Sequence, residues 1–388
     1  MKFGLALPPE HKVFGAFAVY SFAMGNIFPR FADIRHAMGV EEGAFGFGLI
    51  GAPVGTLISL TFGPPLLERI GYRRAILILI PLLSVCYALA GFAPNPIAFF
   101  VLLIPVGLVI GGIETILNLE ADRTEHLVGR RIMNRAHAFW SLGFFSAGLV
   151  GGGIAQLGIS PQVHLLAMIP IIAIGTMLIL GQFDPAPARA GTHADTPKFA
   201  TPNGGILALV AVTLAAMAME GGYMDWSVIY MRNIFDSLPF IAALAVTLGA
   251  GAQALTRFFA DGIVERYSPT SVARVLLGIM AVGIVLVFFS RAEWVSLLGF
   301  ALLGVGSSAI FPLAMSAAAQ RTDRPAAVNV AALAQTSFVT FLLAPPLLGF
   351  IAQHWGIAWS FGIGMPLVVL SFIFAGALGS KPVPHGVE

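Results

Sequence analysis

The sequence predicts an all-α integral membrane protein with twelve transmembrane helices in two pseudo-symmetric six-helix bundles. Three observations predict this fold class: an apolar composition, a series of long apolar windows, and a repeat that relates the two halves of the chain. Of the 388 residues, 57% are hydrophobic and 10% are charged, and the mean hydropathy is +0.88. Soluble domains carry about 25% charged residues, so most of this chain is expected to lie in a bilayer.

Windows of about twenty apolar residues are long enough to cross the hydrocarbon core as helices. Twelve such windows follow one another along the chain. They are residues 12–31, 43–63, 75–93, 96–117, 134–157, 161–181, 204–229, 239–258, 273–290, 293–316, 326–350 and 357–379. The first window lacks the cleavage site of a secretory signal peptide, so it is expected to stay as a spanning helix.

The basic residues are distributed unevenly between the two sets of helix ends. Seventeen of the 21 lysines and arginines fall at the ends that share a side with the termini. The other four are Arg30, Arg35, Arg232 and Arg291. Cytoplasmic loops carry an excess of basic residues, so both termini are predicted to be cytoplasmic.

The longest polar stretch, 182–203, is predicted to be a cytoplasmic linker between residues 1–181 and residues 204–388. Short matches at one offset of 197 residues support this division. They pair Glu68-Arg69 with Glu265-Arg266, Gly107 with Gly304, and Ile154-Ala155-Gln156 with Ile351-Ala352-Gln353. Two parallel repeats of this kind are typical of secondary transporters that rock around a central cavity.

The segment 63–74 resembles the loop 2–3 motif of the major facilitator superfamily, with Glu68-Arg69, Gly71 and a basic pair. It departs from the motif at the first glycine, because Pro64 occupies that position. The segment 257–266 is the equivalent in the second half. The resemblance implies a cytoplasmic charge network that latches the two halves; the alternative is loop residues that simply obey the positive-inside rule. The candidate members of this gate are Glu68, Arg69, Arg73, Arg74, Asp261, Glu265 and Arg266.

Two further stretches, 118–143 and 220–227, are similar to a bacterial branch of that superfamily related to the fucose permease. The second stretch contains the acidic-Asp-Trp-Ser signature of the branch. The resemblance implies a multi-pass transporter of the bacterial cytoplasmic (inner) membrane. It leaves the cargo open, because most members of the branch have no established substrate.

Glu114 lies inside an apolar window, where a carboxylate costs at least roughly 2.5–3.5 kcal/mol at the bilayer centre and normally faces protein or a water-filled cavity. Asn118 is four residues further on and therefore shares its helix face. One interpretation is a group that takes up and releases a proton as access alternates; the other is structural pairing. Glu120 and Glu125 lie near the membrane end with Arg130, and are predicted to form salt bridges at the cytoplasmic gate.

The seventh window contains two carboxylates, Glu220 and Asp225, whose spacing of five places them on different helix faces. Glu220, Tyr223 and Ser227 form one stripe, and we expect Glu220 to face the cavity. Asp225 lies close to the predicted outer end and is interpreted as a structural residue. Its candidate partners in an outer latch are Arg30 and Arg35.

His137 is a candidate for a proton relay, because the unperturbed pKa of histidine is near 6.5. A hydrogen-bonded structural histidine is the alternative. Three tryptophans, at positions 226, 294 and 355, are expected in the interfacial belts. The candidate polar or stacking contacts to a substrate are Asn26, Arg30, Asn118, Trp140, Tyr223, Ser227, Asn329 and Gln335.

The sequence has no phosphate-binding loop that would couple it to ATP, no cluster with metal-ligand spacing and no nucleophile–base pair, so neither enzyme activity nor a cofactor is expected. We expect proton-coupled symport of a small polar metabolite such as a sugar. Proton-antiport efflux of drugs or metabolites is the alternative, and a non-transporting membrane sensor is a minor one. The expected partners are the solute, protons and the lipid bilayer, with no nucleic acid, and the protein is expected to be a monomer.

Overall fold

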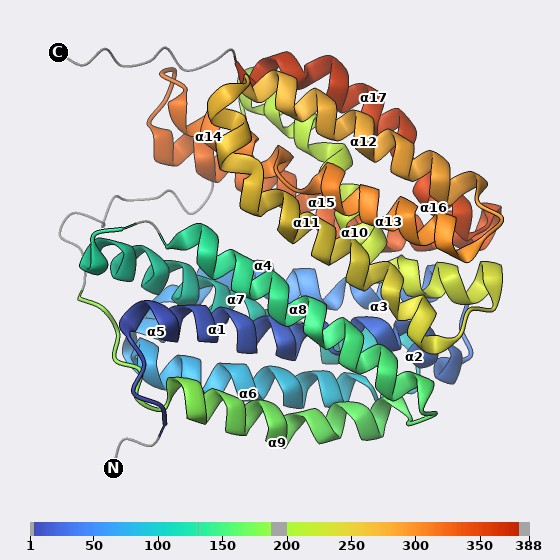
Figure 1. Cartoon of the computed structure of the whole chain (residues 1–388), viewed down its shortest axis with the longest axis horizontal. Coiled ribbons are helices and arrows are strands. Elements are labelled where there is room, and N and C mark those ends of the chain that lie inside the picture. Colours follow the sequence, from blue (N-terminus) through green and yellow to red (C-terminus); the bar gives the residue numbers. More distant parts are fainter. Residues whose placement is uncertain (1–3, 131, 188–199, 380–388) are drawn as a thin grey trace.

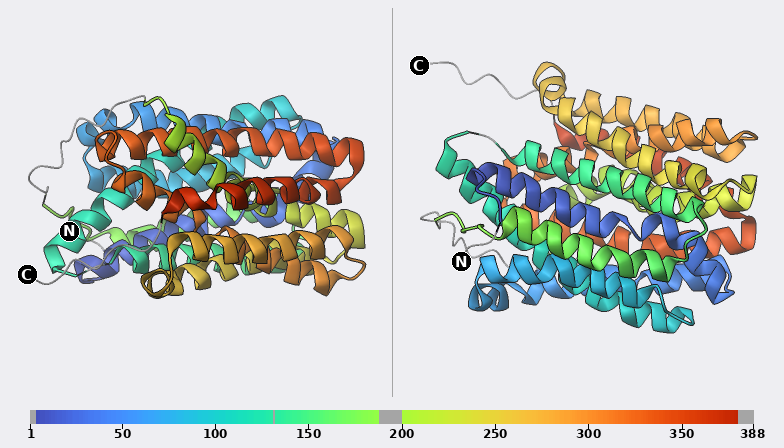
Figure 2. Two further views of the ribbon diagram at one scale, coloured as in Figure 1. Left: turned by 90° about the horizontal axis from the view of Figure 1, so that it is seen from above. Right: turned by 60° about the horizontal axis from the view of Figure 1, so that its bottom comes forward.

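The computed structural model describes residues 4–130, 132–187 and 200–379; the side chains of 134, 260–262, 264 and 265 are not described. These residues are almost entirely helical, and the helices run roughly parallel in two bundles (Figures 1 and 2). Within the described residues, eleven segments are long and apolar enough to cross a membrane. The remaining predicted span is α1, Pro9–Gly25, with 17 residues. The predicted fold class is confirmed.

The first bundle contains the helices up to α9. They are α1 (Pro9–Gly25), η1 (Phe28–Arg30), α2 (Phe31–Met38), α3 (Glu42–Leu49), α4 (Gly51–Phe62), α5 (Pro64–Ile70), α6 (Tyr72–Ala90), α7 (Pro96–Val128), α8 (Met133–Gln156) and α9 (Pro161–Leu180). The second bundle follows. Its helices are α10 (Gly204–Phe235), α11 (Pro239–Arg266), α12 (Pro269–Phe289), α13 (Glu293–Ser307), α14 (Ile310–Gln320), α15 (Ala326–Trp355), α16 (Ile357–Gly362), α17 (Gly364–Phe374) and η2 (Ala375–Leu378).

Several long helices begin at a polar cap that the sequence supplies. Asn95 accepts a hydrogen bond from the backbone N of Ala98 at 2.9 Å, and Asn203 accepts one from that of Ile206 at 3.0 Å. Ser160 caps α9 in the same way. These side chains satisfy backbone donors that a helix N-terminus leaves unpaired. Helix α7 then runs for 33 residues, which is about 50 Å at 1.5 Å per residue and longer than the roughly 30 Å hydrocarbon core.

The internal repeat has a structural counterpart in the helix contacts. Gly107 of α7 packs so closely on Ala52 of α4 that a Cβ would collide with the Ala52 carbonyl oxygen. Gly304 of α13 meets Gly249 of α11 in the same manner. Residue numbers 52 and 249 differ by 197, as do 107 and 304. The two halves therefore repeat a backbone-to-backbone helix contact, which only a residue without a side chain permits.

Both described ends of the chain lie on one side of the molecule, which we call the terminal side; it is at the left of Figure 1. The two bundles meet on the opposite side, where α3 packs on α15 and α8 packs on α11. Gln156 Oε1 accepts a hydrogen bond from the Phe240 backbone N at 3.2 Å. Gln353 Oε1 lies against Gly43, and residues 43 and 353 are the equivalents of 240 and 156 at the 197-residue offset.

A three-residue polar network, Arg35–Glu42–Asn233, also joins the bundles on the opposite side. Arg35 forms an ion pair with Glu42 within the first half. Asn233 of α10 donates to Glu42 Oε1 at 2.9 Å and accepts a hydrogen bond from Arg35 Nη2 at 3.2 Å. Trp226, on the same helix as Asn233, is fully buried, with its ring edge-on to Phe45. Its predicted place in an interfacial belt is therefore wrong, because it packs between the halves, whereas Trp294 and Trp355 are exposed.

The described ends of the predicted linker attach to different halves on the terminal side. The Gln182 backbone O accepts a hydrogen bond from Lys12 Nζ at 2.6 Å. Beyond residues 188–199, which lie outside the described part, the Thr201 backbone O accepts one from Arg324 at 2.8 Å. Nearby, hydrogen bonds from Arg321 and Asn203 lower the pKa of Asp323 to about 2.

Candidate functional site

A central cavity of about 580 Å³ lies between the two bundles. Side chains from both halves line it, and they are mainly apolar and aromatic with a few polar groups. The polar and aromatic members are Phe28, Phe31, Thr56, Tyr87, Glu114, Thr115, Asn118, Trp140, Glu220, Asp225, Phe338 and Phe341. Binding sites of transported solutes occur at such interfaces between repeats.

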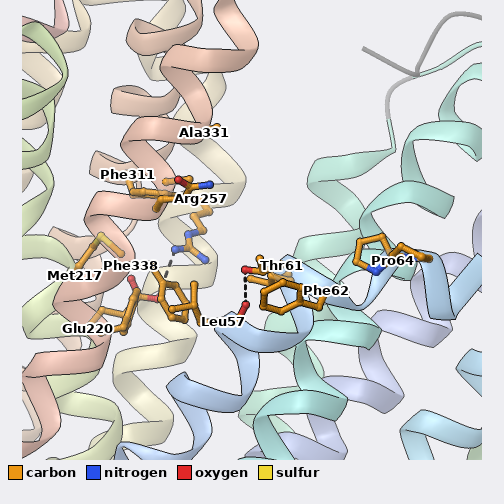
Figure 3. Close-up of a pocket in the computed structure, with 15 residues that line it drawn as sticks. Leu57, Thr61, Phe62, Pro64, Met217, Glu220, Arg257, Phe311, Ala331 and Phe338 are labelled. Carbon is orange, nitrogen blue, oxygen red and sulfur yellow. Dashed lines mark hydrogen bonds and ion pairs between the residues drawn. The ribbon is translucent and has the colours of Figure 1, made fainter. Parts of the chain in front are cut away.

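Two further compartments adjoin the central cavity on the terminal side. The mouth, about 700 Å³, shares Glu220, Phe338 and Phe341 with it and extends to Phe62 and Pro64 at the α4–α5 junction. The side chamber, about 760 Å³, shares Asn118 with the central cavity and reaches His137 and Met315. Figure 3 shows the mouth, with Leu57 and Thr61 of the first half facing Glu220 and Phe338 of the second. Space between the halves therefore continues from the centre toward the terminal side.

Glu114 is the polar centre of the first-half wall. Its Oε1 accepts a hydrogen bond from the Tyr20 hydroxyl of α1 at 2.8 Å. Its Oε2 accepts one from Asn118 Nδ2 at 3.1 Å, and the same amide also donates to the Glu114 backbone O at 2.9 Å. The predicted shared face of Glu114 and Asn118 is thus present, and each oxygen of the carboxylate has a donor.

Glu220 stands on the second-half wall, between the central cavity and the mouth. Arg257 Nη2 of α11 lies 3.7 Å from its Oε1, as the dashed line in Figure 3 shows. Arg257 is held from the other side because its Nε donates to the Ser308 backbone O at 2.8 Å. The cavity-facing position expected for Glu220 is observed, together with a cationic partner from the neighbouring helix.

Asp225 also lines the central cavity, which differs from the expected outer latch. Both of its candidate partners are engaged elsewhere: Arg30 with Asp33 at 3.0 Å, and Arg35 with Glu42. Tyr87 of the first half lines the same cavity. The latch hypothesis is wrong. Consecutive residues of a helix point in different directions, so Trp226 packs between the halves while Asp225 lines the cavity.

Trp140 and His137 stand on α8, one turn apart. Trp140 lines the central cavity and stacks on Phe144 with ring centroids 5.4 Å apart, while its Nε1 is buried without a hydrogen-bond partner among the described residues. His137 lines the side chamber, and its ring meets Phe17 edge-on at 5.1 Å. Arg257 lines the same chamber. The hydrogen bonds described for the Glu114 carboxylate come from Tyr20 and Asn118, and none comes from His137.

Five other candidates for the cavity wall are packed inside the bundles. Asn26 contacts His164 at 3.1 Å, Arg30 donates to the Ile159 backbone O at 2.6 Å, and Tyr223 donates to Gln253 at 3.1 Å. Ser227 and Asn329 are likewise fully buried. None of the five is among the residues that line the three described compartments. Gln335 does line the mouth, and its Oε1 accepts a hydrogen bond from the Ala200 backbone N.

The candidate gate residues lie at the terminal side, and the contacts described for Glu120, Glu125, Arg130 and Arg73 join parts of residues 10–186 rather than the two halves. Glu120 accepts a hydrogen bond from the Ala186 backbone N at 2.9 Å and lies 3.4 Å from Arg123. Glu125 accepts hydrogen bonds from two backbone amides at the start of α8, and Arg130 pairs with Glu10 at 2.8 Å.

The remaining gate candidates come from the motif and its counterpart. Arg73 donates to the Gly181 backbone O at 2.6 Å. The side chains of Asp261 and Glu265 lie outside the described part of the chain. The others are placed by their helices: Glu68 and Arg69 on α5, Arg74 at the start of α6, and Arg266 at the end of α11.

Three polar residues of the site had no role in the sequence-based interpretation. Tyr20 and Tyr87 sit in apolar windows where a tyrosine is unexceptional. Arg257 was noted only as part of a loop motif, although a basic residue within the eighth apolar window, 239–258, could have indicated an intramembrane partner for a carboxylate.

Two helical bundles around a cavity that continues to one side define a membrane transporter of the two-repeat class. The sequence matches the family model of the Major Facilitator Superfamily over residues 13–338 and 208–387. The chain belongs to this superfamily, whose members are transporters rather than enzymes, and it is a multi-pass membrane protein.

Relatives extend over most of the chain. It is 30% identical over 353 residues to y4wD, an uncharacterised transporter of Sinorhizobium fredii, covering 89% of this chain and 92% of that protein. It is 26% identical over 357 residues to an uncharacterised MFS-type transporter of Yersinia pestis, covering 89% and 90% respectively. These likenesses support transport as the general activity and specify no cargo.

Solved structures share the fold at low identity. A mutant of the nucleoside transporter NupG superposes with a TM-score of 0.75 at 11% identity, covering 96% of this chain and 99% of NupG. The D-xylose-proton symporter superposes with a TM-score of 0.70 at 15% identity, covering 96% of this chain and 97% of the symporter. The Escherichia coli fucose:proton symporter FucP superposes with a TM-score of 0.58 at 18% identity, covering 96% of this chain and 98% of FucP.

Proposed function

We propose that this protein is a secondary active transporter that moves a small polar solute by alternating access, coupled to proton symport at Glu114. The observation that carries the proposal is the position of Glu114 in the wall of the central cavity, with Tyr20 and Asn118 donating to its two oxygens. An ionised carboxylate accepts both hydrogen bonds, whereas a protonated one must use an oxygen as a donor. Proton uptake therefore changes the contact between α1 and α7.

Alternating access requires that one side be sealed while the other is open. Here the Arg35–Glu42–Asn233 network and the glutamine contacts seal the side opposite the termini, and the mouth lies on the terminal side. With the excess of basic residues on the terminal side, we infer that the cavity faces the cytoplasm across the bacterial inner membrane. Residues 1–181 and 204–388 would then move as two units of a monomer, joined by the linker 182–203.

The named functions of structural neighbours support solute–proton symport as the working hypothesis. FucP is described as a fucose:proton symporter, and another neighbour as a D-xylose-proton symporter. NupG is described as a nucleoside transporter. All three cargoes are polar molecules with sugar rings, and a polar solute suits a cavity that offers Asn118 and three carboxylates beside aromatic faces.

The test begins with a thermal-shift screen of sugars, organic acids, amino acids and siderophore-like compounds on purified protein. Uptake of a stabilising compound is then measured in proteoliposomes, with and without an inward proton gradient. We expect gradient-driven accumulation in the wild type and its loss in Glu114→Gln. Exchange of labelled for unlabelled solute without a gradient should persist in Glu114→Gln, because exchange needs the cavity and the conformational change but no net proton movement.

Accumulation by Glu114→Gln that still follows the proton gradient would remove Glu114 from the coupling role. Accumulation by the wild type that ignores the gradient would remove proton coupling altogether. Reversal of the gradient separates symport from antiport, because a proton antiporter accumulates solute only when the vesicle interior is acidic.

A further inference from the structure

The central cavity carries an unbalanced set of charges. Three carboxylates line it, those of Glu114, Glu220 and Asp225, and among the described residues that line it there is no lysine or arginine. Each carboxylate comes from a long transmembrane helix, α7 or α10, so none is a surface group that bulk water screens. The charge of the cavity therefore depends on how each carboxylate is compensated.

Two of the three carboxylates have partners on the protein. Arg257 lies 3.7 Å from Glu220 at the border with the mouth. The two oxygens of Glu114 accept hydrogen bonds from Tyr20 and Asn118. Glu114 therefore has its main interactions within the first half, and Glu220 has its main interaction within the second half.

Asp225 differs, because no hydrogen bond or ion pair reaches its carboxylate from the part of the chain that the structure describes. It lines the central cavity, and so does Tyr87 of the other half. An ionised carboxylate in a mainly apolar cavity is disfavoured without a counter-charge or a hydrogen-bond donor. The missing partner is thus a cation or a hydrogen-bond donor that enters the cavity.

The walls around Asp225 suit an organic cation. Aromatic rings from both halves face the same cavity: Phe28, Phe31, Tyr87 and Trp140 from the first, and Phe338 and Phe341 from the second. A cationic group over an aromatic face gains electrostatic attraction that grows when water is excluded. An anion would meet three carboxylates and the negative faces of these rings.

We propose that the cargo of the central cavity carries a protonated amine, and that Asp225 is the residue that recognises it. The proposal rests on the transport function proposed above and names the class of its cargo: a small polar solute with one ammonium group, distinguished from neutral and anionic analogues of the same size. Glu114 remains the proton site, and Glu220 is neutralised by Arg257. Because Asp225 and Tyr87 come from different halves and line the same cavity, an ammonium bound between them touches both halves.

A charge-selective labelling experiment tests this recognition without knowledge of the cargo. Thr115 lines the central cavity, and Thr115→Cys in a Cys86→Ser background gives one reactive thiol there. Purified protein in detergent at pH 8 is treated with three methanethiosulfonates: the 2-aminoethyl, the 2-sulfonatoethyl and the neutral methyl compound. Rates are divided by those of a small free thiol, so that only the effect of the cavity remains.

We expect the corrected rate of the ammonium reagent to exceed that of the sulfonate reagent by about tenfold or more, the range in which charged clefts change local ion concentrations. Asp225→Asn should lower this ratio about tenfold and leave the rate of the neutral reagent unchanged. Asp236→Asn is the matched control: Asp236 follows the same helix, is exposed, and lies outside the cavity, so the ratio should not change.

An unchanged ratio in Asp225→Asn, with the neutral rate also unchanged, would overturn the proposal, because Asp225 would then be uncharged or directed away from the cavity. Faster labelling by the sulfonate reagent in the wild type would also overturn it. A changed rate of the neutral reagent would indicate a disturbed fold. The variant Asp225→Glu, which keeps the charge, is then measured. Recovery of the ammonium-to-sulfonate ratio supports recognition by charge, and failure to recover opposes it. None of these results depends on proton coupling, so they stand apart from the Glu114 test.

Discussion

The Arg35–Glu42–Asn233 network predicts how strongly the opposite side is held shut. Asn233→Leu keeps the approximate shape of the side chain and removes both hydrogen bonds between the halves. A hydrogen bond to a charged group contributes about 1.5–3 kcal/mol when buried, but Asn233 is exposed, so about 1 kcal/mol for each bond is the better figure. The closed arrangement should lose about 2 kcal/mol in total, which changes the ratio of closed to open molecules about 30-fold.

Distances between spin labels measure this shift directly. His36, in the first half, and Trp355, in the second, are exposed on the opposite side, and cysteines at these two positions, with Cys86→Ser, carry the labels. Pulsed electron–electron double resonance should show one main distance in the parent protein and a second, longer distance in Asn233→Leu. Gln162→Leu is the matched control, because the Gln162 amide donates to the Gly91 backbone O within the first half.

The reasoning is refuted if Asn233→Leu and the parent protein give superimposable distance distributions. In that case the packing of α3 on α15 and of α8 on α11 alone would hold the side closed. A longer distance in Gln162→Leu as well would mean that general destabilisation, rather than loss of the bonds between the halves, opens the protein.

Three further perturbations follow from particular contacts. Tyr20→Phe removes the 2.8 Å hydrogen bond to Glu114 and should lower the initial rate of gradient-driven uptake about tenfold, while solute exchange continues. Gly304→Ala places a Cβ against a neighbouring backbone and should lower the thermal unfolding temperature by about 3 °C or more, whereas Gly278→Ala, which meets nothing within 4 Å, should not. Asp323, with its pKa lowered to about 2, stabilises the fold above its unfolded pKa of about 3.9; the difference in unfolding temperature between wild type and Asp323→Asn should stay constant from pH 8 to 5 and shrink as the pH falls from 4 toward 2.

The fold could be predicted from the sequence because bilayer physics leaves few alternatives. A segment of about twenty apolar residues must form a helix in hydrocarbon, since its backbone groups have no other partners. The 197-residue offset then related the halves, and the structure shows matched contacts at Gly107 and Gly304. Spacing along one helix was correct for Glu114 and Asn118, which are four residues apart and hydrogen-bonded. It was not sufficient for the predicted stripe of Glu220, Tyr223 and Ser227, because only Glu220 lines the cavity.

Positions that depend on contacts between helices could not be predicted in this way. Tyr20 and Glu114 are 94 residues apart, and no local pattern relates them. Asp225 and Trp226 are neighbours in sequence, yet one lines the cavity and the other packs between the halves. An all-round apolar helix has almost no amphipathic signal to show which face meets lipid, protein or water.

The sequence by itself determined the class of the protein, its number of spans and the presence of costly carboxylates in apolar windows, because these follow from local composition and from hydrogen bonding within each helix. Only the tertiary structure decided which side chains contact each carboxylate. Arg257 lies beside Glu220 and Tyr20 beside Glu114, while Asp225 faces open space. Helix rotation and packing between the two halves set these pairings, and they depend on the whole chain at once.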